Sequence, residues 1–551
     1  MIFVTTIHQH LERQARTRPL APALSARDAT LTYAELWQAV RRAGARLAGL
    51  GVARHDRVAV FLEKRFETVA ALWGTSVAGG VFVPVNPLLK GKQVAHVLRD
   101  SGARVLVTSP GRLNAVRDHL GDTGLTTVLL VDPADGGLPH DLPRLPELPG
   151  LTVLRWAPSP DGDPSPADRS GEPADATDLA GAPLAPSGPD TDIAAILYTS
   201  GSTGAPKGVV LSHRNLVVGA TSVSGYLHNT AEDVLLAVLP LSFDAGLSQL
   251  TTAFAVGAHV VLHDYLLPRG VTTACEQYGV TGITGVPPLW TQLAGVEWPS
   301  GARFALRYFA NTGGRMPAAL LGELRELFPA AAPYLMYGLT EAFRSTYLDP
   351  AQVDARPGSI GRAIPNAEVL VLRPDGTPCG PDEPGELVHR GSLVALGYWN
   401  DPERTAARFR PVPGYDEPWR AVPEPAVWSG DTVVRDAEGY LYFVGREDEM
   451  IKTSGYRVSP TEVEEAALGT GLVREAVAVG VLDDRLGQRI ALAVLAPEPV
   501  DTDRLLKEMR QTLPTFMLPA QVHVAAAFPR NPNGKLDRPA IRAELVAEVA
   551  E

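Results

Sequence analysis

The sequence predicts an α/β protein with parallel sheets covered by helices. Short apolar segments that have the character of buried strands alternate with longer segments of helical apolar spacing. The strand-like segments are residues 57–62, 104–109, 127–132 and 259–264, and the helical spacing is clearest over residues 66–77. This alternation is typical of βαβ units. Because 551 residues are many for one hydrophobic core, we expect several subdomains.

Two stretches depart from the alternation. Between residues 158 and 190 the composition shifts to Pro, Asp, Gly, Ser and Ala, which predicts a poorly ordered surface connection. Residues 350–445 are rich in Gly and Pro and contain the short strand-like segments EVLVL, GELVH and YLYFVG. This pattern predicts a small β-barrel or sandwich.

The composition excludes several classes of function. A net charge of −12 argues against nucleic-acid binding, because no basic stripe is present to displace counterions from phosphates. The cysteines, Cys275 and Cys379, lack metal-ligand spacing and indicate free thiols in a reducing compartment. No signal peptide and no run of about eighteen apolar residues is found. We therefore expect a cytoplasmic protein with neither nucleic acid nor membrane as partner.

The segment YTSGSTGAPKG, residues 198–208, has the composition of a loop that cradles phosphate. Its glycines let backbone N–H groups approach an anion, and its hydroxyl groups and lysine add donors and positive charge. It is not a Walker A loop, because Pro206 rather than Gly precedes Lys207. The alternative is a plain surface loop between two elements. The residues expected to bind phosphate are Thr199, Ser200, Gly201, Ser202, Thr203, Gly204 and Lys207.

This segment resembles the ATP-phosphate loop of the adenylate-forming superfamily, which includes acyl-CoA synthetases, adenylation domains of nonribosomal peptide synthetases, and firefly luciferase. Further superfamily motifs follow in the required order: NTGGRM (311–316), YGLTE (337–341), WSGD (428–431), GRED (445–448) and PRNPNGKLDR (529–538). The resemblance implies a large N-terminal domain of two α/β subdomains plus a small β-barrel, residues 1–447. It also implies a small mobile α+β C-terminal domain, residues 448–551, with its hinge at Asp448.

The nucleotide motifs imply a role for particular residues. By resemblance, Thr340 donates to the α-phosphate, and Glu341 helps to hold Mg²⁺, a hard cation that prefers oxygen ligands. Asp431 would accept hydrogen bonds from both ribose hydroxyls, which suits an ionised carboxylate. Taken alone, YGLTE could equally be a helix-capping Thr followed by a first-turn Glu. The other residues implied in nucleotide binding are Gly313, Gly314, Tyr337, Gly338 and Arg446.

Two C-terminal segments imply two successive reactions at one site. Lys535 matches the superfamily lysine that reaches the reacting carboxylate and the α-phosphate. Its alternative is a solvated turn lysine after Asn533-Gly534. The segment SGYRV, residues 454–458, matches the face that lines a thiol tunnel after the C-terminal domain has turned. There Gly455 lets pantetheine pass close to the backbone.

The segment LPLSFDAGLSQ, residues 239–249, bears on the substrate. Many acyl-CoA synthetases have an aromatic-His pair here, whereas amino-acid-activating members have Phe-Asp, as in Phe243-Asp244. The alternative is an Asp that caps the following helix. The pattern looks most like AMP-forming ligases associated with exosortase systems and small-molecule gene clusters. Pro288 and Arg344 depart from the usual pattern and could line the acyl pocket.

Together these motifs imply a ligase that uses ATP and Mg²⁺ to adenylate a small carboxylic acid. The Asp favours an amino acid, and the acceptor is a phosphopantetheine thiol on a free-standing carrier protein, because no carrier domain follows Lys535. One alternative is an acyl-CoA synthetase that uses CoA and a non-amino acid. A third possibility is a nucleotide-binding regulator without activity, which the intact Lys535, Glu341 and Asp431 argue against.

Overall fold

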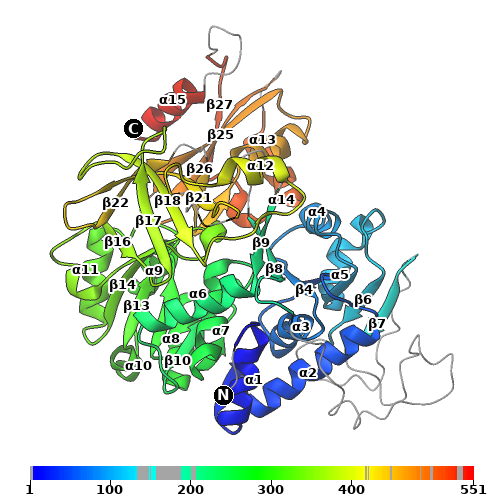
Figure 1. The fold of residues 1–551 in the computed structure, drawn as a ribbon. Coiled ribbons are helices and arrows are strands. Elements are labelled where there is room, and N and C mark those ends of the chain that lie inside the picture. The colour runs from blue at the N-terminus through cyan, green and yellow to red at the C-terminus, as the bar shows by residue number, and fades with distance from the viewer. Residues whose placement is uncertain are drawn as a thin grey trace.

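The computed structural model describes residues 4–132, 148, 150–156, 188–199, 206–415, 419, 421–446, 450–483, 485–496, 500–529 and 538–550. Within these residues the strands form three sheets, of fourteen, eight and five strands. In Figure 1 the larger two lie side by side, and the C-terminal elements, coloured orange and red, lie above both.

The fourteen-stranded sheet is parallel from β14 to β1 and antiparallel elsewhere. Its order is β17 (Ala367–Leu372), β18 (Gly385–Gly391), β21 (Ala426–Arg435), β22 (Leu441–Arg446), β16 (Ser359–Ala363), β15 (Thr346–Leu348), β14 (Ala332–Tyr337), β13 (Tyr308–Asn311), β12 (Gly282–Gly285), β10 (Val234–Ala237), β11 (His259–Leu262), β1 (Pro22–Ala26) and β2 (Ala29–Thr32), with β20 (Phe409–Arg410) on β21.

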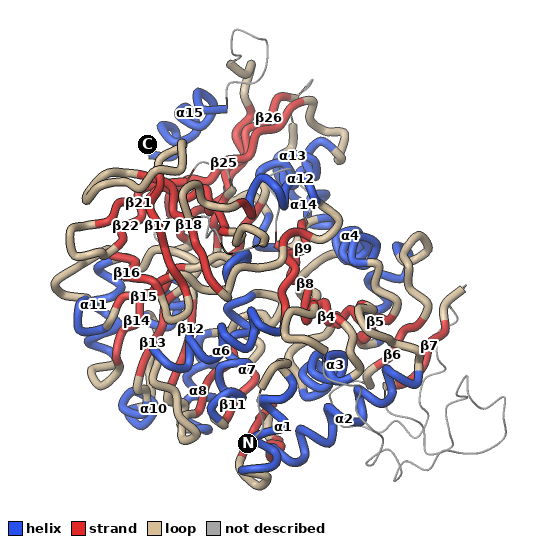
Figure 2. The backbone as a smooth tube through the Cα atoms, viewed as in Figure 1, coloured by secondary structure: helices blue, strands red, loops and turns tan. Residues whose placement is uncertain are grey.

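The strands expected as a small β-barrel occupy one end of this sheet, where Figure 2 shows β17, β18, β21 and β22 together. They are continuous with the α/β part because β15 pairs antiparallel with both β14 and β16. Among the described residues no ladder joins β16 to β17, so the strands do not close into a ring. The region is therefore an open extension of the sheet.

The eight-stranded sheet has parallel strands from β7 to β8, followed by two antiparallel strands. Its order is β19 (Gly397–Tyr398), β9 (Lys207–Ser212), β8 (Ile193–Thr199), β4 (Val81–Pro84), β3 (Arg57–Phe61), β5 (Val105–Thr108), β6 (Thr127–Leu130) and β7 (Thr152–Arg155).

Helices cover the sheets, and short 3₁₀ turns connect some elements. The α-helices are α1 (His8–Thr17), α2 (Tyr33–Gly49), α3 (Phe66–Val77), α4 (Gly91–Ser101), α5 (Pro110–Val116), α6 (His213–Tyr226), α7 (Asp244–Val256), α8 (Pro268–Tyr278), α9 (Pro287–Ala294), α10 (Ser300–Ala305), α11 (Ala318–Leu327), α12 (Pro402–Arg408), α13 (Pro460–Leu468), α14 (Thr502–Thr512) and α15 (Arg538–Ala550). The 3₁₀ turns are η1 (Arg117–His119), η4 (Thr340–Ala342), η5 (Pro350–Gln352) and η6 (Thr515–Met517).

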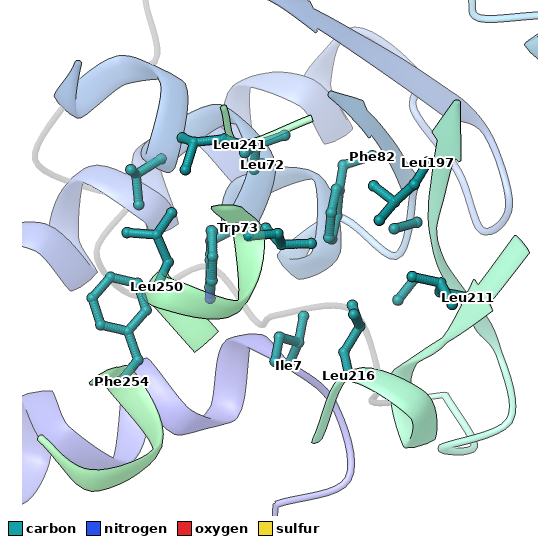
Figure 3. Close-up of a cluster of buried hydrophobic side chains, with 14 of the residues drawn as sticks. Ile7, Leu72, Trp73, Phe82, Leu197, Leu211, Leu216, Leu241, Leu250 and Phe254 are labelled. Atoms are coloured by element: carbon teal, nitrogen blue, oxygen red, sulfur yellow. The ribbon is translucent and has the colours of Figure 1, made fainter. Parts of the chain in front are cut away.

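One hydrophobic core joins the two large sheets. It contains side chains of α3, α6 and α7 together with strands of both sheets, and Figure 3 shows Trp73 of α3 among them. The Trp73 ring meets Phe254 of α7 edge to face at 5.3 Å. Every residue of α3 from Thr68 to Val77 is buried, so this helix is covered on all sides. The burial fixes the two sheets against each other.

The C-terminal sheet has the order β24 (Tyr456–Val458), β23 (Ile451–Thr453), β26 (Gly487–Leu495) and β25 (Glu475–Asp483), with β27 (Gln521–Val524) on β26. Alternate residues of β25 serve two cores because strand side chains point to opposite faces in turn. Ala476 and Ala478 lie in the core with α13 and α14, and Val477 and Val479 lie in the core with α15.

Most of the elements expected from the sequence are confirmed. The four predicted strands are β3, β5, β6 and β11, each one or two residues shorter than predicted, and the predicted helix is α3 with the same bounds. Of the connection expected over residues 158–190, only 188–190 lie within the described residues. The change from the large sheets to the C-terminal sheet falls between β22 and β23. The domain boundary at 447/448 stays a prediction.

Candidate active site

Lys207 and Glu341, predicted to act on the phosphates, form a buried ion pair. Lys207 opens β9, and Glu341 lies in η4. The Lys207 Nζ donates to Glu341 Oε1 at 3.0 Å and to the Tyr398 hydroxyl at 2.7 Å. That hydroxyl in turn donates to Glu341 Oε1 at 2.7 Å. Tyr398 reaches this point because β19 pairs antiparallel with β9. The ammonium also lies 4.1 Å from the centre of the Tyr398 ring.

The charges around Glu341 keep it ionised although it is buried. Burial alone would raise the pKa of this carboxyl, but Lys207, Arg457 and Arg408 hold the pKa well below its usual range, as does the Tyr398 hydrogen bond. Burial lowers the pKa of Lys207, and the neighbouring Glu341 opposes this effect. The site therefore concentrates positive charge around one carboxylate, which suits the binding of a polyphosphate anion.

The residues predicted at the adenosine meet at the end of β14. The hydroxyl of Tyr337 donates to the Asp431 carboxylate, which is buried in β21. Arg446 closes β22 directly opposite Asp431 in the ladder between the two strands. Gly338 follows Tyr337, and a Cβ at Gly338 would lie 3.0 Å from the Arg344 Cα. The backbone here has no room for a side chain.

The Gly313-Gly314 segment forms a turn after β13. Gly313 has a φ of +73°, a conformation that suits glycine, and the Asn311 side-chain amide donates to the Gly314 carbonyl at 2.8 Å. The Asn311 side-chain carbonyl oxygen is buried and has no hydrogen-bond partner in the described part of the chain. This turn offers an acceptor oxygen to a donor such as the exocyclic amine of adenine.

Asp244 does not cap the helix that it begins. The N-cap of α7 is Phe243, which makes no side-chain capping bond, and Asp244 is the first helical residue. Its Oδ2 instead accepts a hydrogen bond from Arg344 Nη1 at 2.5 Å. Arg344 is 2% exposed and Asp244 16%. The capping alternative is therefore wrong, and the carboxylate belongs to a buried ion pair with Arg344. Of the two unusual residues, Arg344 lines the adjoining cavity.

The hairpin that carries Gly455 is seated on the large domain. Ser454 and Gly455 both have positive φ, the geometry of a tight two-residue hairpin turn between β23 and β24. A Cβ at Gly455 would come within 2.7 Å of Val286 Cγ2. The next residue, Tyr456, stacks on Phe516 at 3.7 Å and meets Phe243 edge to face at 5.2 Å. The C-terminal domain thus presents its SGYRV face to the candidate site.

Several predicted residues lie outside the described residues: Ser200, Gly201, Ser202, Thr203, Gly204, Asp448 and Lys535. The described ends of the phosphate loop are in place, because Thr199 and Lys207 are opposite each other in the ladder of β8 and β9. The Thr199 hydroxyl is buried there with no hydrogen-bond partner among the residues described.

Sequence reasoning missed Tyr398 and Arg408, and it placed Arg457 only on the face of the thiol tunnel; all three act on Glu341. Tyr398 lies 191 residues from Lys207, and only the pairing of β19 with β9 brings them together. The signal that might have found it is local: GYW, residues 397–399, places two aromatic residues after a glycine, between the apolar run LVAL (393–396) and the polar run NDPER (400–404).

The donor set fits Mg²⁺ bound chiefly through nucleotide phosphates. Within the described residues no group of three or more His, Cys, Asp and Glu side chains could hold a metal by itself. Mg²⁺ usually binds one or two carboxylates and substrate phosphates, and Glu341 is an ionised carboxylate beside the phosphate loop.

None of the described helices is both long and apolar enough to cross a bilayer.

Comparison with known proteins identifies the family of the chain. The AMP-binding enzyme family matches residues 11–399, and the AMP-binding enzyme C-terminal domain matches residues 462–535. The feruloyl-CoA synthase of Amycolatopsis sp is 31% identical over 96% of this chain and 97% of its own length. A linear gramicidin synthase protein of Brevibacillus parabrevis is 28% identical over 98% of this chain, and the match spans 6% of that much longer protein.

Among solved structures, the o-succinylbenzoate CoA synthetase of Bacillus subtilis, bound to a product analogue, superposes with a TM-score of 0.76 at 24% identity. The match covers 97% of this chain and 98% of that one, and it confirms the mixed α/β fold with a large N-terminal and a smaller C-terminal domain. The comparisons do not show the expected closeness to exosortase-associated ligases, which stays a prediction.

Proposed function

Because the chain belongs to the AMP-binding enzyme family, whose members include AMP-forming acid–thiol ligases, we propose that it activates a small carboxylic acid with ATP and passes it to a phosphopantetheine thiol. In the first step a carboxylate oxygen attacks the α-phosphorus, the bond to the β-phosphate breaks, and pyrophosphate leaves. In the second step the thiol sulfur attacks the acyl carbon, loses its proton, and releases AMP.

The single observation that carries this proposal is the ionised, buried Glu341 held by Lys207 beside the phosphate loop. Lys207 and the backbone of the loop would bind the phosphates, and Thr340 would donate to the α-phosphate. Asp431 and Tyr337 would hold the adenosine. When bound, Mg²⁺ would neutralise phosphate charge next to Glu341. Lys535 would bind the reacting carboxylate in the adenylating orientation of the C-terminal domain.

The orientation of the C-terminal domain seen here suits the second step. The Ser454-Gly455 hairpin and Arg457 are at the site. We take Gly455 as the wall of the thiol tunnel and Asp448 as the hinge. The variant Gly455→Leu would clash with Val286, so it should lose thioester formation and keep pyrophosphate exchange. Equal loss of both half-reactions would contradict this division between orientations.

The acid and the acceptor remain matters of proposal. An amino acid bound through Asp244, and a carrier protein acting in trans, were the expectation from the sequence. The pairing of Asp244 with Arg344 instead favours an acid without an α-ammonium group. The match to the feruloyl-CoA synthase covers 96% of this chain, so CoA is the first acceptor to test. The expected cytoplasmic location belongs to this proposal as well.

The deciding experiment is ATP–pyrophosphate exchange over a panel of aryl, short aliphatic and α-amino acids, followed by thioester formation with CoA and with a phosphopantetheinyl carrier protein. We expect exchange with at least one acid and its loss by two or more orders of magnitude in Lys535→Ala. ATP binding without exchange for any acid would instead favour the inactive nucleotide-binding regulator.

A further inference from the structure

The cavity beside α7 has a partly apolar lining that also includes the polar side chains of Gln249, Thr252, Thr284 and Tyr308. Apolar side chains from α6, β10 and β14, among them Val223, Leu235 and Met336, line it together with polar groups such as Ser248. Arg344 is the charged residue of the described lining. The free volume is about 20 Å³, roughly that of one water, so an acid enters only when lining side chains move.

A strained turn directs Arg344 into this position. Phe343 has φ +59° and ψ −58°, and the Arg344 N–H donates to the Ala342 carbonyl at 2.6 Å. These values describe a γ-turn with positive φ, which is rare and strained for a residue with a side chain. The Phe343 ring is fully buried against Gly219, where a Cβ would lie 2.5 Å away. Tight packing therefore maintains a conformation that the chain would otherwise avoid.

Arg344 has donor capacity that the protein leaves unused. Its Nη1 donates to Asp244 Oδ2 at 2.5 Å and to the Phe343 carbonyl at 2.7 Å. Its Nε is buried and has no hydrogen-bond partner among the described residues. A buried N–H without a partner is destabilising, because it has lost its hydrogen bonds to water. An acceptor atom brought by a ligand would remove that destabilisation.

The charge balance restricts what that acceptor can be. Arg344 and Asp244 neutralise each other. A ligand carboxylate beside them would leave a net negative charge in a partly apolar cavity, and an ammonium would leave a net positive one. Burying an unbalanced charge is costly, whereas a neutral oxygen satisfies the N–H and adds no charge.

From these observations we infer that Arg344 selects acids that carry an uncharged oxygen acceptor, such as a ketone or ether, at the end away from the reacting carboxylate. In this arrangement Asp244 orients the guanidinium and does not bind a substrate ammonium. The inference rests on the proposed function, since it names the class of acid that the same site would activate. Arg344 is thus a specificity residue.

The test uses matched acids of equal size in pyrophosphate exchange with the full-length protein. The aliphatic set is 4-oxopentanoate, 4-methylpentanoate, 4-aminopentanoate, glutarate and norvaline. The aryl set is 4-methoxybenzoate, 4-ethylbenzoate, 4-(aminomethyl)benzoate and terephthalate. In at least one set we expect kcat/KM for the keto or methoxy acid to exceed that of its hydrocarbon analogue by about ten- to a hundred-fold, and the charged analogues to be poorer still.

The informative variant is Arg344→Met combined with Asp244→Asn, which leaves no unpaired charge in the cavity. It should reduce the preference for the oxygen-bearing acid to about one-fold while exchange with the hydrocarbon analogue continues. Exposed Arg42→Met on α2 is the matched control and should keep the parent preference. An unchanged preference in the double variant, or a parent preference for norvaline or another charged acid, would overturn the inference.

Thermal shifts separate this inference from the proposed function. The same acids are added to the protein, and the rise in Tm reports binding without chemistry. Absence of exchange with every acid would count against the ligase proposal alone. The ranking of Tm shifts still decides the role of Arg344: a larger shift with the oxygen-bearing acids, lost in the double variant, supports it. Equal shifts for the oxygen-bearing and hydrocarbon acids, or none for any acid, refute it.

Discussion

The structure has two neighbouring buried ion pairs, Lys207–Glu341 and Arg344–Asp244, which differ in what surrounds them. Glu341 of the first pair and Arg344 of the second are three residues apart in the chain. Around Glu341 two arginines add positive charge to that of Lys207, and a tyrosine hydroxyl donates a hydrogen bond. The cluster as a whole is therefore cationic. Around Arg344 the lining is partly apolar, and a single carboxylate balances the guanidinium.

The difference indicates how one fold can keep its chemistry and vary its substrate. A cationic cluster attracts any polyphosphate, which suits a step common to all substrates. A neutral pair in a partly apolar cavity attracts no ion and distinguishes ligands by whether they satisfy one N–H. The following changes test whether the two pairs are as different as their surroundings suggest.

The largest effect is expected from Glu341→Gln. The variant removes the only negative charge that the structure shows among three cations, so the described site loses both a proposed magnesium ligand and the partner of Lys207. We expect kcat/KM for ATP in pyrophosphate exchange to fall by about 10²–10³-fold. Exposed Glu323→Gln on α11 is the control. Wild-type exchange in Glu341→Gln would show that the carboxylate is merely structural.

The second pair should matter more for stability. The variant Asp244→Asn leaves the buried guanidinium without its counter-charge, which typically costs about 3 kcal/mol in the free energy of unfolding. Adding Arg344→Met should recover most of this loss, and urea unfolding of both single variants and the double variant measures the coupling. Additive losses would mean that the two side chains do not depend on each other.

A smaller effect is expected from Tyr398→Phe. The change removes the hydroxyl that bridges Lys207 and Glu341 but keeps the ring under the ammonium. A hydrogen bond to a charged group is worth about 1.5–3 kcal/mol, and part of it is replaced by the direct contact of lysine and carboxylate. We expect roughly a ten-fold loss in kcat/KM for ATP. A loss as large as that of Glu341→Gln would mean that Tyr398 contacts the reacting groups.

The smallest effect concerns a third carboxyl, that of Glu462, which is largely buried and has no cation beside it among the described residues. Glu462 of α13 accepts a hydrogen bond from the Gln93 side chain of α4 at 2.5 Å. Burial raises its pKa to about 7, against the Gln93 hydrogen bond and with help from Glu465. Since the folded pKa is raised, the stabilisation is complete below pH about 4.5 and is lost as the pH rises through about 7.

The Tm of the parent should therefore fall by a few degrees between pH 5 and pH 8 relative to that of Glu462→Gln, which mimics the protonated carboxyl. The same pH dependence in both proteins would show that Glu462 does not titrate at the contact between the domains. In that case the Glu462 carboxyl would be solvated, in contrast to the buried carboxyl of Glu341.

The sequence predicted the parts of the molecule that depend on local patterns. The helix over residues 66–77 has apolar residues on all sides, and strand β3 is a short buried apolar segment, so each could be identified without its neighbours. Motif order likewise grouped Lys207, Glu341, Tyr337 and Asp431, and the structure shows Lys207 in contact with Glu341 and Tyr337 in contact with Asp431.

What the sequence could not predict depends on contacts between distant residues. Asp244 and Arg344 were both noticed, but their pairing spans 100 residues and needs the turn at Phe343. The small β-barrel was expected from strand composition, yet whether the strands close into a ring depends on whether β16 pairs with β17, and no ladder joins them among the described residues.

The turn at Phe343 has one further consequence. It joins Glu341 to Arg344 through a short, strained and closely packed peptide, so we expect a movement of one side chain to affect the other. If an acid draws Arg344 into the cavity, the work done on the turn changes the affinity for ATP, and ATP changes the affinity for the acid by the same factor. The protein would then bind ATP and the acid with positive cooperativity, and the strain at Phe343 would determine how strong that cooperativity is.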